Sequence, residues 1–442
     1  HGALLGARTI YDERPHGRVR KGIKMDLNEQ ARDILRQNDK GGYTLPTHGL
    51  YPYQWNWDSA FAAWGLATFD LARAWDEFDT LMASQWNTGM VPHIIFHAPD
   101  PGYFPGPDVW STGQTPETSG ISQPPVAATL ARLVWEMDKA QSHERMAAIF
   151  PKLVEWHRWW HEVRCTHGPA AITHPWESGR DNCPDWDIGM AGVDGSGVAP
   201  YTRRDTGHVD PSMRPSKAEY DRYIAMVQFG VEAGWDQDRI VADGPFLMAD
   251  PGITFILLRA HEDRAVLGQA LNEDVSEIES WARALRNALP LIWNADLKGY
   301  DAKNLRTGEF AGVLGSGAFL AYLADAGNPE LDEQLLRVWD AVSYGIPSAD
   351  PQAEIFDPRR YWRGPTWPVV NALMALGLRD SGRADLEARL RAETAELIEK
   401  HGFFEYFDPI DATPCGGSNF TWTAAIWLTW AGHDLEQARG AA

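Results

Sequence analysis

The chain has 442 residues, of which 44% are hydrophobic and 23% are charged, and this composition predicts a soluble globular protein with a large core. Its formal net charge of −21 argues against nucleic acid as a partner, because a phosphate backbone is bound through a basic surface. No stretch is apolar over the length that a membrane span needs, so no membrane partner is expected. The N-terminal stretch HGALLGARTI lacks the pattern of a signal peptide.

Apolar residues recur with the helical period of 3.6 along most of the chain. Within 126–138, for example, Leu130, Leu133, Val134 and Met137 fall on one face. No convincing pair of alternating strands is predicted, so the expected class is all-α. In chain order, the pattern predicts helices over about 24–37, 58–69, 71–86, 126–138, 143–163, 217–233, 252–263, 267–289, 313–325, 330–343, 366–379, 383–400 and 420–437.

The connections between these helices alternate between short turns and long loops. The long loops are rich in Gly, Pro, Asp and Trp and occupy 87–120, 166–216, 344–365 and 402–419. This alternation indicates a toroid of paired helices with the long loops on one side, where loops of such length usually carry function. No shift in composition marks a second domain, so residues 1–442 are expected to form one.

The cysteines and histidines do not indicate a metal site. Cys165, Cys183 and Cys415 have neither the number nor the spacing of a disulfide framework or a zinc site. The two histidines of HEVRCTH (161–167) are six residues apart, which does not fit zinc binding on a helix. We therefore expect reduced thiols, a cytoplasmic location and no metal.

Tryptophan is unusually frequent, with 21 residues, several times its usual share. Most are expected to fill a helical core, but clusters at 55–57, 176–186 and 362–367 lie in turns rich in Gly and Pro. An indole ring can stack on the apolar face of a pyranose while polar neighbours bind its hydroxyls. These three clusters therefore favour a sugar site.

Two carboxylates lie within such aromatic stretches. Asp181 belongs to HPWESGRDNCPDW (174–186), where Arg180 would lower its pKa and burial would raise it; alternatively, Asp181 caps a turn and Glu177 pairs with Arg180. Glu405, in the stretch GFFEYFDP, is flanked by four aromatic residues; alternatively, it faces solvent in a brief extended segment. Hydrolysis of a glycosidic bond needs one carboxylic acid to protonate the leaving oxygen and one carboxylate to activate water or attack.

Two further stretches combine aromatic and polar residues. In LYPYQWNWDSAF (50–61), Asp58 could cap a helix or accept two sugar hydroxyls. The cap alone would leave unexplained the adjacent Tyr51, Tyr53, Trp55 and Trp57. In YWRGPTWP (361–368), a rigid Gly-Pro turn sets Arg363 between Trp362 and Trp367.

The stretches QWNWDSAF, WESGRDNCP, YWRGPTWPVVN, and GFFEYFDP followed by FTWTAA resemble glycoside hydrolase family 63. They are closest to its short bacterial branch of mannosylglycerate and glucosylglycerate hydrolases, and they follow the expected order from residue 50 to 430. The resemblance implies an (α/α)6 barrel and an inverting mechanism without a cofactor. It also implies that Asp181 is the general acid and Glu405 the general base.

The resemblance further implies a set of substrate-binding residues. Arg214 and Tyr220, with Tyr361 beside them, would bind the carboxylate of a glycerate group, which an arginine fork matches well. The branch is expected to carry a glutamine near the last Gly-rich loop, where this chain has Asn419 in GGSNFTWTA. The remaining substrate-binding residues would be Tyr51, Trp55, Trp57, Asp58, Tyr103, Gln123, Trp176, Gly179, Arg363, Gly364 and Trp367.

The expected substrate is a small α-glucoside or α-mannoside, with glucosylglycerate or mannosylglycerate favoured by the short chain. Loops 87–120 and 187–216 are expected to form a lid over it. An α-glucosidase acting on neutral di- or oligosaccharides is the alternative within the family. A sugar epimerase on the same toroid and a non-catalytic sugar-binding protein are alternatives of other classes, and the sequence leaves open a homo-oligomer.

Overall fold

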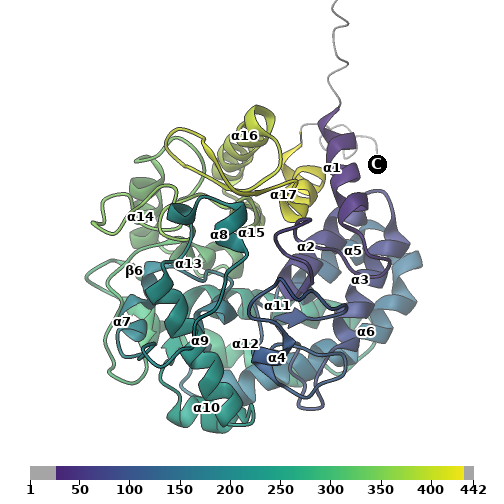
Figure 1. Cartoon of the computed structure of the whole chain (residues 1–442). Helices are drawn as coiled ribbons and strands as arrows, with labels where there is room; N and C mark the ends of the chain where they lie inside the picture. Colours follow the sequence, from purple (N-terminus) through teal and green to yellow (C-terminus); the bar gives the residue numbers. More distant parts are fainter. Residues whose placement is uncertain (1–25, 433–442) are drawn as a thin grey trace, which may run out of the picture.

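The structure, a computed structural model, describes residues 26–432. Within that range it contains every helix expected from the apolar period (Figure 1). One expected boundary is wrong, because α11 (Pro251–Ala270) continues without a break through residues 264–266 and α12 (Ser276–Ala288) begins only later. The expected helix ends at 24–25 and 433–437 lie outside the described residues, as does the stretch HGALLGARTI.

Six helical segments pack side by side into a closed ring, and each has an outer helix against it, so the expected (α/α)6 barrel is confirmed. In ring order the inner segments are α2 (Asn56–Leu66), α5 (Ala127–Met137), α11, α13 (Ser316–Phe319) with η6 (Leu320–Ala324), α15 (Pro368–Asp380) and α17 (Thr421–Ile426), which returns to α2. The outer partners, in the same order, are α3 (Leu71–Ala83), α6 (Lys139–Trp159), α12, α14 (Pro329–Trp339), α16 (Ala384–His401) and α1 (Leu27–Asn38).

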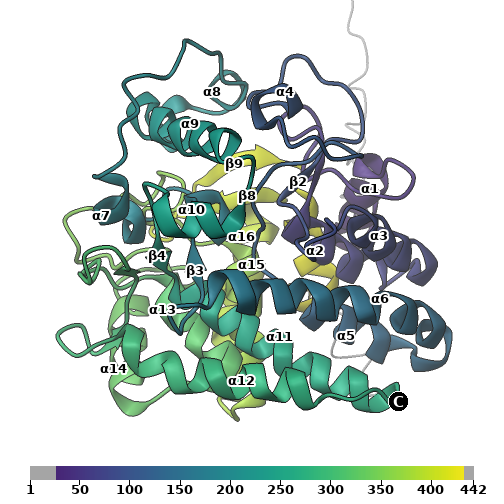
Figure 2. The same cartoon turned by 90° about the horizontal axis from the view of Figure 1, so that it is seen from below.

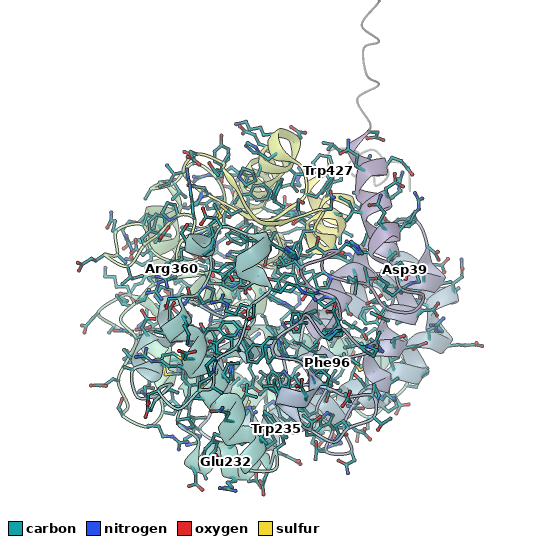
Figure 3. All side chains as sticks on the ribbon, in the orientation of Figure 1. Asp39, Phe96, Glu232, Trp235, Arg360 and Trp427 are labelled. Atoms are coloured by element: carbon teal, nitrogen blue, oxygen red, sulfur yellow. The ribbon has the colours of Figure 1, made fainter. Side chains whose placement is uncertain are left out.

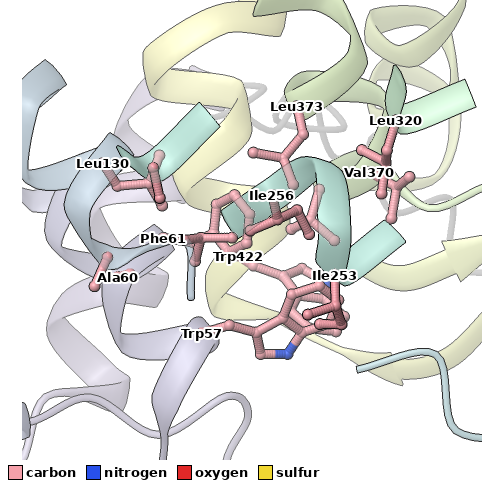
Figure 4. Close-up of a cluster of buried hydrophobic side chains, with 14 of the residues drawn as sticks. Trp57, Ala60, Phe61, Leu130, Ile253, Ile256, Leu320, Val370, Leu373 and Trp422 are labelled. Carbon is pink, nitrogen blue, oxygen red and sulfur yellow. The ribbon is translucent and has the colours of Figure 1, made fainter. Parts of the chain in front are cut away.

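The sequence explains which helices form the inner wall. Every residue of α2 is buried, and so are the first eleven residues of α15, which begins with Pro368 in the first turn, where a missing N–H costs nothing. The outer helices are amphipathic, with one apolar stripe against the inner ring. All six inner segments meet in one apolar layer (Figure 4), which includes Trp57, Ala60, Phe61, Leu130, Ile253, Ile256, Leu320, Val370, Leu373 and Trp422. Side chains fill the ring (Figure 3).

Long connecting segments lie at one end of the barrel, where Figure 2 shows α4 (Pro107–Trp110), α8 (Asp205–His208) and α9 (Lys217–Glu232). The smaller helices in the loops are α7 (Asp187–Met190), α10 (Gln237–Asp243), η2 (Pro175–Ser178), η3 (Pro184–Trp186), η4 (Pro211–Met213) and η5 (Leu289–Ile292); η1 (Trp160–Arg164) and η7 (Trp427–Ala431) extend α6 and α17. Among the described helices, none has the length and apolar character that a membrane crossing requires.

Short antiparallel strands tie the loops together, although the sequence predicted no strand pair. They have two to five residues, too few for a period of two to show. The pairs are β1 (Gln54–Trp55) with β2 (Ile94–Ile95), β3 (Ala171–Ile172) and β7 (Lys303–Asn304) with β4 (Met248–Ala249), β5 (Trp293–Asn294) with β6 (Gly299–Tyr300), and β8 (Phe404–Phe407) with β9 (Pro414–Ser418).

Candidate active site

A pocket opens at the end of the barrel that carries the long loops. It encloses about 870 Å³, part of it open to solvent. Segments far apart in the sequence line it, and it brings Asp181 and Glu405 to one place. The other expected residues in its wall are Tyr51, Trp55, Trp57, Asp58, Tyr103, Gln123, Trp176, Gly179, Arg214, Tyr220 and Tyr361.

Glu405 lies on β8 and is buried, so the alternative of a solvent-facing residue is wrong. Its Oε1 accepts a hydrogen bond from the hydroxyl of Tyr51 at 3.1 Å, and its Oε2 accepts one from the N–H of Gly417 at 3.0 Å. Burial raises the pKa of this carboxyl, while Arg214, Gly417 and Tyr51 act in the opposite direction. The carboxyl is thus removed from bulk water but held by donors that suit its ionised form.

Asp181 lies in the turn between η2 and η3, and its Oδ2 accepts a hydrogen bond from the hydroxyl of Tyr361 at 3.3 Å. Burial raises the pKa of Asp181 to about 7, and the charge of Glu405 adds to this rise. Arg214 is the cation that opposes it, rather than the neighbouring Arg180. A carboxyl with this pKa is protonated in a large fraction of molecules near neutral pH, as a general acid must be.

The alternative pairing of Glu177 with Arg180 is also wrong. Glu177 is buried and forms an ion pair with Arg164 at 2.8 Å. Arg180 instead contacts Asp185 at 2.7 Å and Asp250 at 2.6 Å. Two buried arginines therefore anchor the stretch that carries Asp181: Arg164 through Glu177, and Arg180 through Asp185 and Asp250.

Arg214 is buried in the pocket wall, and its charge lowers the pKa of both candidate catalytic carboxyls. Its Nη1 lies 3.6 Å from Oε1 of Glu405 and makes no hydrogen bond. Its Nη2 donates to the hydroxyl of Tyr51 at 2.7 Å, and its Nε donates to Asp205 at 3.1 Å. The guanidinium also lies 4.0 Å from the ring centre of Tyr361. The Nε and Nη2 atoms of this cation are thus held by Asp205 and Tyr51, while Nη1 can still donate hydrogen bonds.

The first turn of α2 contributes Trp57 and Asp58 to the pocket wall beside Arg214 and the two carboxyls. Asp58 is not the N-cap, because that position belongs to Trp55. It is buried in the pocket wall, and burial together with the charges of Glu405 and Asp181 raises its pKa well above the usual range. Gln123 accepts a hydrogen bond from the backbone N–H of Trp57 at 3.0 Å and so fixes the start of the helix.

Three expected substrate-binding residues lie outside the pocket wall. Arg363 forms an ion pair with Asp187 at 2.6 Å, and the N–H of Gly364 donates to a buried serine hydroxyl. Trp367 stacks behind Trp362 with ring centres 3.7 Å apart, and it is Trp362 that lines the pocket. The side chain of Asn419, where the branch was expected to carry glutamine, is exposed and is not part of this wall.

The pocket also contains residues that the sequence reasoning did not single out. His93 is a buried example, whose pKa burial lowers well below the usual range. Most of the others lie inside or next to stretches that had been marked as functional, and that proximity was their only signal. The lining residues that the resemblance did not assign to substrate binding are Pro46, Leu50, His93, Ile94, Phe104, Pro105, Arg204, Asp205, Pro215, Trp362, Phe420 and Trp422. Of these, Trp362 belongs to the tryptophan cluster at 362–367 that favoured a sugar site.

The loops 87–120 and 187–216 contact each other beside the pocket. Arg204 of the second loop forms an ion pair with Asp100 of the first. The rings of Phe104 and Tyr201 stack with centres 4.5 Å apart. Both loops also contribute residues to the pocket wall, so they bound the space around Asp181 and Glu405.

A family model described as the mannosylglycerate hydrolase MGH1-like glycoside hydrolase domain matches residues 51–423. The chain belongs to this family. It is therefore a glycoside hydrolase, and the expected inverting enzyme of family 63 is confirmed over the epimerase and the non-catalytic sugar-binding protein.

Curated relatives and a solved structure resemble nearly the whole chain. Mannosylglycerate hydrolase MGH1 of Selaginella moellendorffii is 41% identical over 96% of this chain and 90% of its own length. Glucosylglycerate hydrolase of Mycolicibacterium hassiacum is 34% identical over 92% and 98%. The crystal structure of GH63 mannosylglycerate hydrolase from Thermus thermophilus in complex with Tris and D-glycerate is 42% identical, with a TM-score of 0.89 over 92% of this chain and 100% of that one.

Proposed function

We propose that this glycoside hydrolase cleaves a small α-mannoside or α-glucoside of glycerate, releasing the sugar and glycerate. The observation that carries the proposal is the buried Arg214, whose Nη1 retains donor capacity in the pocket that holds Asp181 and Glu405. A carboxylate on the leaving group is a matched ligand for such a guanidinium. The names of the mannosylglycerate and glucosylglycerate hydrolases support the same choice, as does the D-glycerate in the Thermus complex.

In the proposed reaction, Asp181 is the general acid. It gives its proton to the glycosidic oxygen as the bond from that oxygen to the anomeric carbon breaks. Glu405 is the general base and takes a proton from a water molecule whose oxygen forms the new bond on the opposite face of the sugar. The raised pKa of Asp181, about 7, supports this assignment, because the acid must carry its proton at the start of the step.

Substrate binding is proposed to divide between two parts of the pocket. Arg214, Tyr220 and Tyr361 would hold the glycerate carboxylate, in keeping with the guanidinium over the ring of Tyr361. The sugar would stack on indole rings while Asp58 and Gln123 accept or donate hydrogen bonds at its hydroxyls. The sugar-binding group consists of Tyr51, Trp55, Trp57, Asp58, Tyr103, Gln123, Trp176 and Gly179, all in the pocket wall.

We further propose that residues 1–442 form a single catalytic domain and that loops 87–120 and 187–216 close over the substrate as a lid. The ion pair of Arg204 with Asp100 supports the lid, because it joins two loops that both line the pocket. All three cysteines of the sequence are free, which supports the proposed cytoplasmic location. The proposed partner is a small carbohydrate.

The proposal is tested by proton NMR of the purified enzyme with α-mannosylglycerate, α-glucosylglycerate and a neutral α-glucoside in parallel. Initial release of the β-sugar from one of the glycerate substrates is the expected result, with Asp181→Ala as the inactive control. Cleavage of the neutral glucoside alone would favour an α-glucosidase and overturn the glycerate assignment. Release of the α-sugar first would overturn inversion and the roles given to the two carboxyls.

A further inference from the structure

The residue next to the proposed general acid is held in a buried socket. Arg180 directly precedes Asp181, and its guanidinium is buried. Its Nη1 donates to Oδ2 of Asp185 at 2.7 Å, and its Nη2 donates to Oδ1 of Asp250 at 2.6 Å. Its backbone carbonyl accepts a hydrogen bond from the indole of Trp186 at 2.8 Å. Both the side chain and the backbone of Arg180 are therefore fixed.

The socket belongs to the inner wall of the barrel. Asp250 is the N-cap of α11, and the same Oδ1 that contacts Arg180 accepts the N–H of Gly252 at 2.7 Å. The opposite side of the socket is Gly317 of α13, where an added Cβ would lie 2.7 Å from the guanidinium. Because α11 and α13 are neighbouring inner segments, Arg180 ties the turn carrying Asp181 directly to the rigid ring.

The buried position of Arg180 is not explained by an effect of its charge on the pKa of Asp181. The largest influences on the pKa of Asp181 are burial, Arg214, Tyr361, Glu405 and its own backbone, and Arg180 is not one of these. Its charge is matched by two carboxylates. A buried ion pair of this kind contributes little net stability, since desolvation offsets the attraction, but it fixes geometry because each partner admits few alternatives.

We infer that Arg180, together with Asp250 and Asp185, is a positioning device that sets the carboxyl of Asp181 against the leaving-group oxygen. The inference rests on the proposed function, because it takes Asp181 as the general acid. Proton transfer depends on a donor–acceptor distance within hydrogen-bond reach, and a displacement of about 1 Å costs roughly 100-fold in rate. Loosening the socket should therefore weaken acid catalysis and leave the rest of the site working.

The test compares two leaving groups in the Asp250→Asn enzyme. Asparagine keeps an oxygen that can cap α11 but loses the charge that pairs with Arg180. With α-mannosylglycerate, or its gluco counterpart if that is preferred, we expect kcat to fall about 10- to 100-fold while KM changes less than about 3-fold. With the corresponding α-glycosyl fluoride, whose departure needs little protonation, kcat should stay within about 3-fold of the parent enzyme.

Two further variants make the result specific. Asp263→Asn is the control, because it also removes a buried ion-paired carboxylate from α11: Asp263 contacts Arg132 at 2.6 Å and Arg259 at 2.8 Å. This variant should leave kcat unchanged with both leaving groups. Arg180→Lys keeps the charge but lacks the planar fork whose separate nitrogens reach Asp185 and Asp250, so it should repeat the selective loss if Asp250→Asn does not fold. The melting temperature of each variant separates misfolding from mispositioning.

Equal loss of kcat with both leaving groups, or no loss with either, in a folded variant would overturn the inference. The proposed function fails in a different way, because the parent enzyme would then not cleave the glycerate substrate, whatever its activity on the fluoride. Asp181→Ala supplies the reference pattern, with a large loss for the glycerate substrate and a small one for the fluoride. A variant of Arg180 or Asp250 confirms that the socket acts through Asp181 if its kcat falls with the glycerate substrate but not with the fluoride, and falls less than in Asp181→Ala.

Discussion

The guanidinium of Arg214 lies 3.6 Å from the carboxylate of Glu405, buried from solvent. This proximity couples two functions, because the cation proposed to bind the substrate carboxylate also lowers the pKa of the proposed base. It lowers the pKa of Asp181 as well. Changing Arg214 should therefore alter both substrate preference and pH dependence.

The first prediction concerns Arg214→Gln. The KM for an α-glycosylglycerate should rise about 10- to 100-fold, the equivalent of losing roughly 1.5–3 kcal/mol of charge-assisted hydrogen bonding. The KM for a neutral α-glucoside should change less than about 3-fold. Steady-state kinetics with each substrate, measured at the optimum pH of each enzyme, gives the comparison. Equal changes in both KM values would remove the glycerate role from this residue.

The second prediction concerns the alkaline limb of the pH profile. Since the pKa of Asp181 is about 7, kcat/KM should fall above that pH, by about 10-fold per pH unit once the acid is ionised. The hydroxyl of Tyr361 donates to this carboxyl and lowers its pKa, so Tyr361→Phe should move the limb to higher pH. A limb that stays in place in Tyr361→Phe would show that another group titrates there.

The long helices were predictable from the sequence because each depends on a local period, whereas the short loop helix α10 and the ion pairs at the site were not. The sequence offers Glu177, three residues away, as an alternative partner for Arg180. The structure pairs Arg180 with Asp250, which is 70 residues distant and reaches it only once α11 has joined the ring. Likewise, the turn around Arg363 has no period that tells which of its two tryptophans faces the pocket. The resemblance located Asp181 and Glu405; their hydrogen-bond partners needed the structure.

The third prediction concerns stability in acid and rests on three histidines packed between helices. Nδ1 of His157 lies 3.1 Å from Nδ1 of His261, whose Nε2 lies 2.7 Å from Nε2 of His161. Burial lowers the pKa of each, and the neighbouring Arg264 lowers it further. For His161 the pKa falls from its ordinary 6.5 to about 4. These three histidines have no role in the proposed reaction, so their protonation should change the free energy of unfolding and not the activity.

Because the folded pKa of His161 lies below the unfolded one, the unfolded chain binds more protons between pH 6.5 and 4. The free energy of unfolding should therefore decrease as the pH falls through this window, with about 1–3 kcal/mol coming from His161. Denaturant unfolding at several pH values should show a shallower decrease in His161→Gln. His143→Gln, at an exposed position of α6, should keep the slope of the parent, and an unchanged slope in both variants would refute the prediction.

The last prediction concerns Gly416, which faces the proposed base across the β8–β9 pair. Its φ of +72° suits glycine, and an added Cβ would collide with Oε2 of Glu405. Gly416→Ala should therefore displace the base and lower kcat about 100-fold. Gly402→Ala is the control, because its φ of +84° is also positive and no atom lies within 4 Å of the new methyl group. Both variants should fold with a lowered melting temperature. Only Gly416→Ala should lose turnover, with the fluoride and the glycerate substrate alike, since the base is needed for both. Loss with the glycerate substrate alone would place the damage at Asp181 instead.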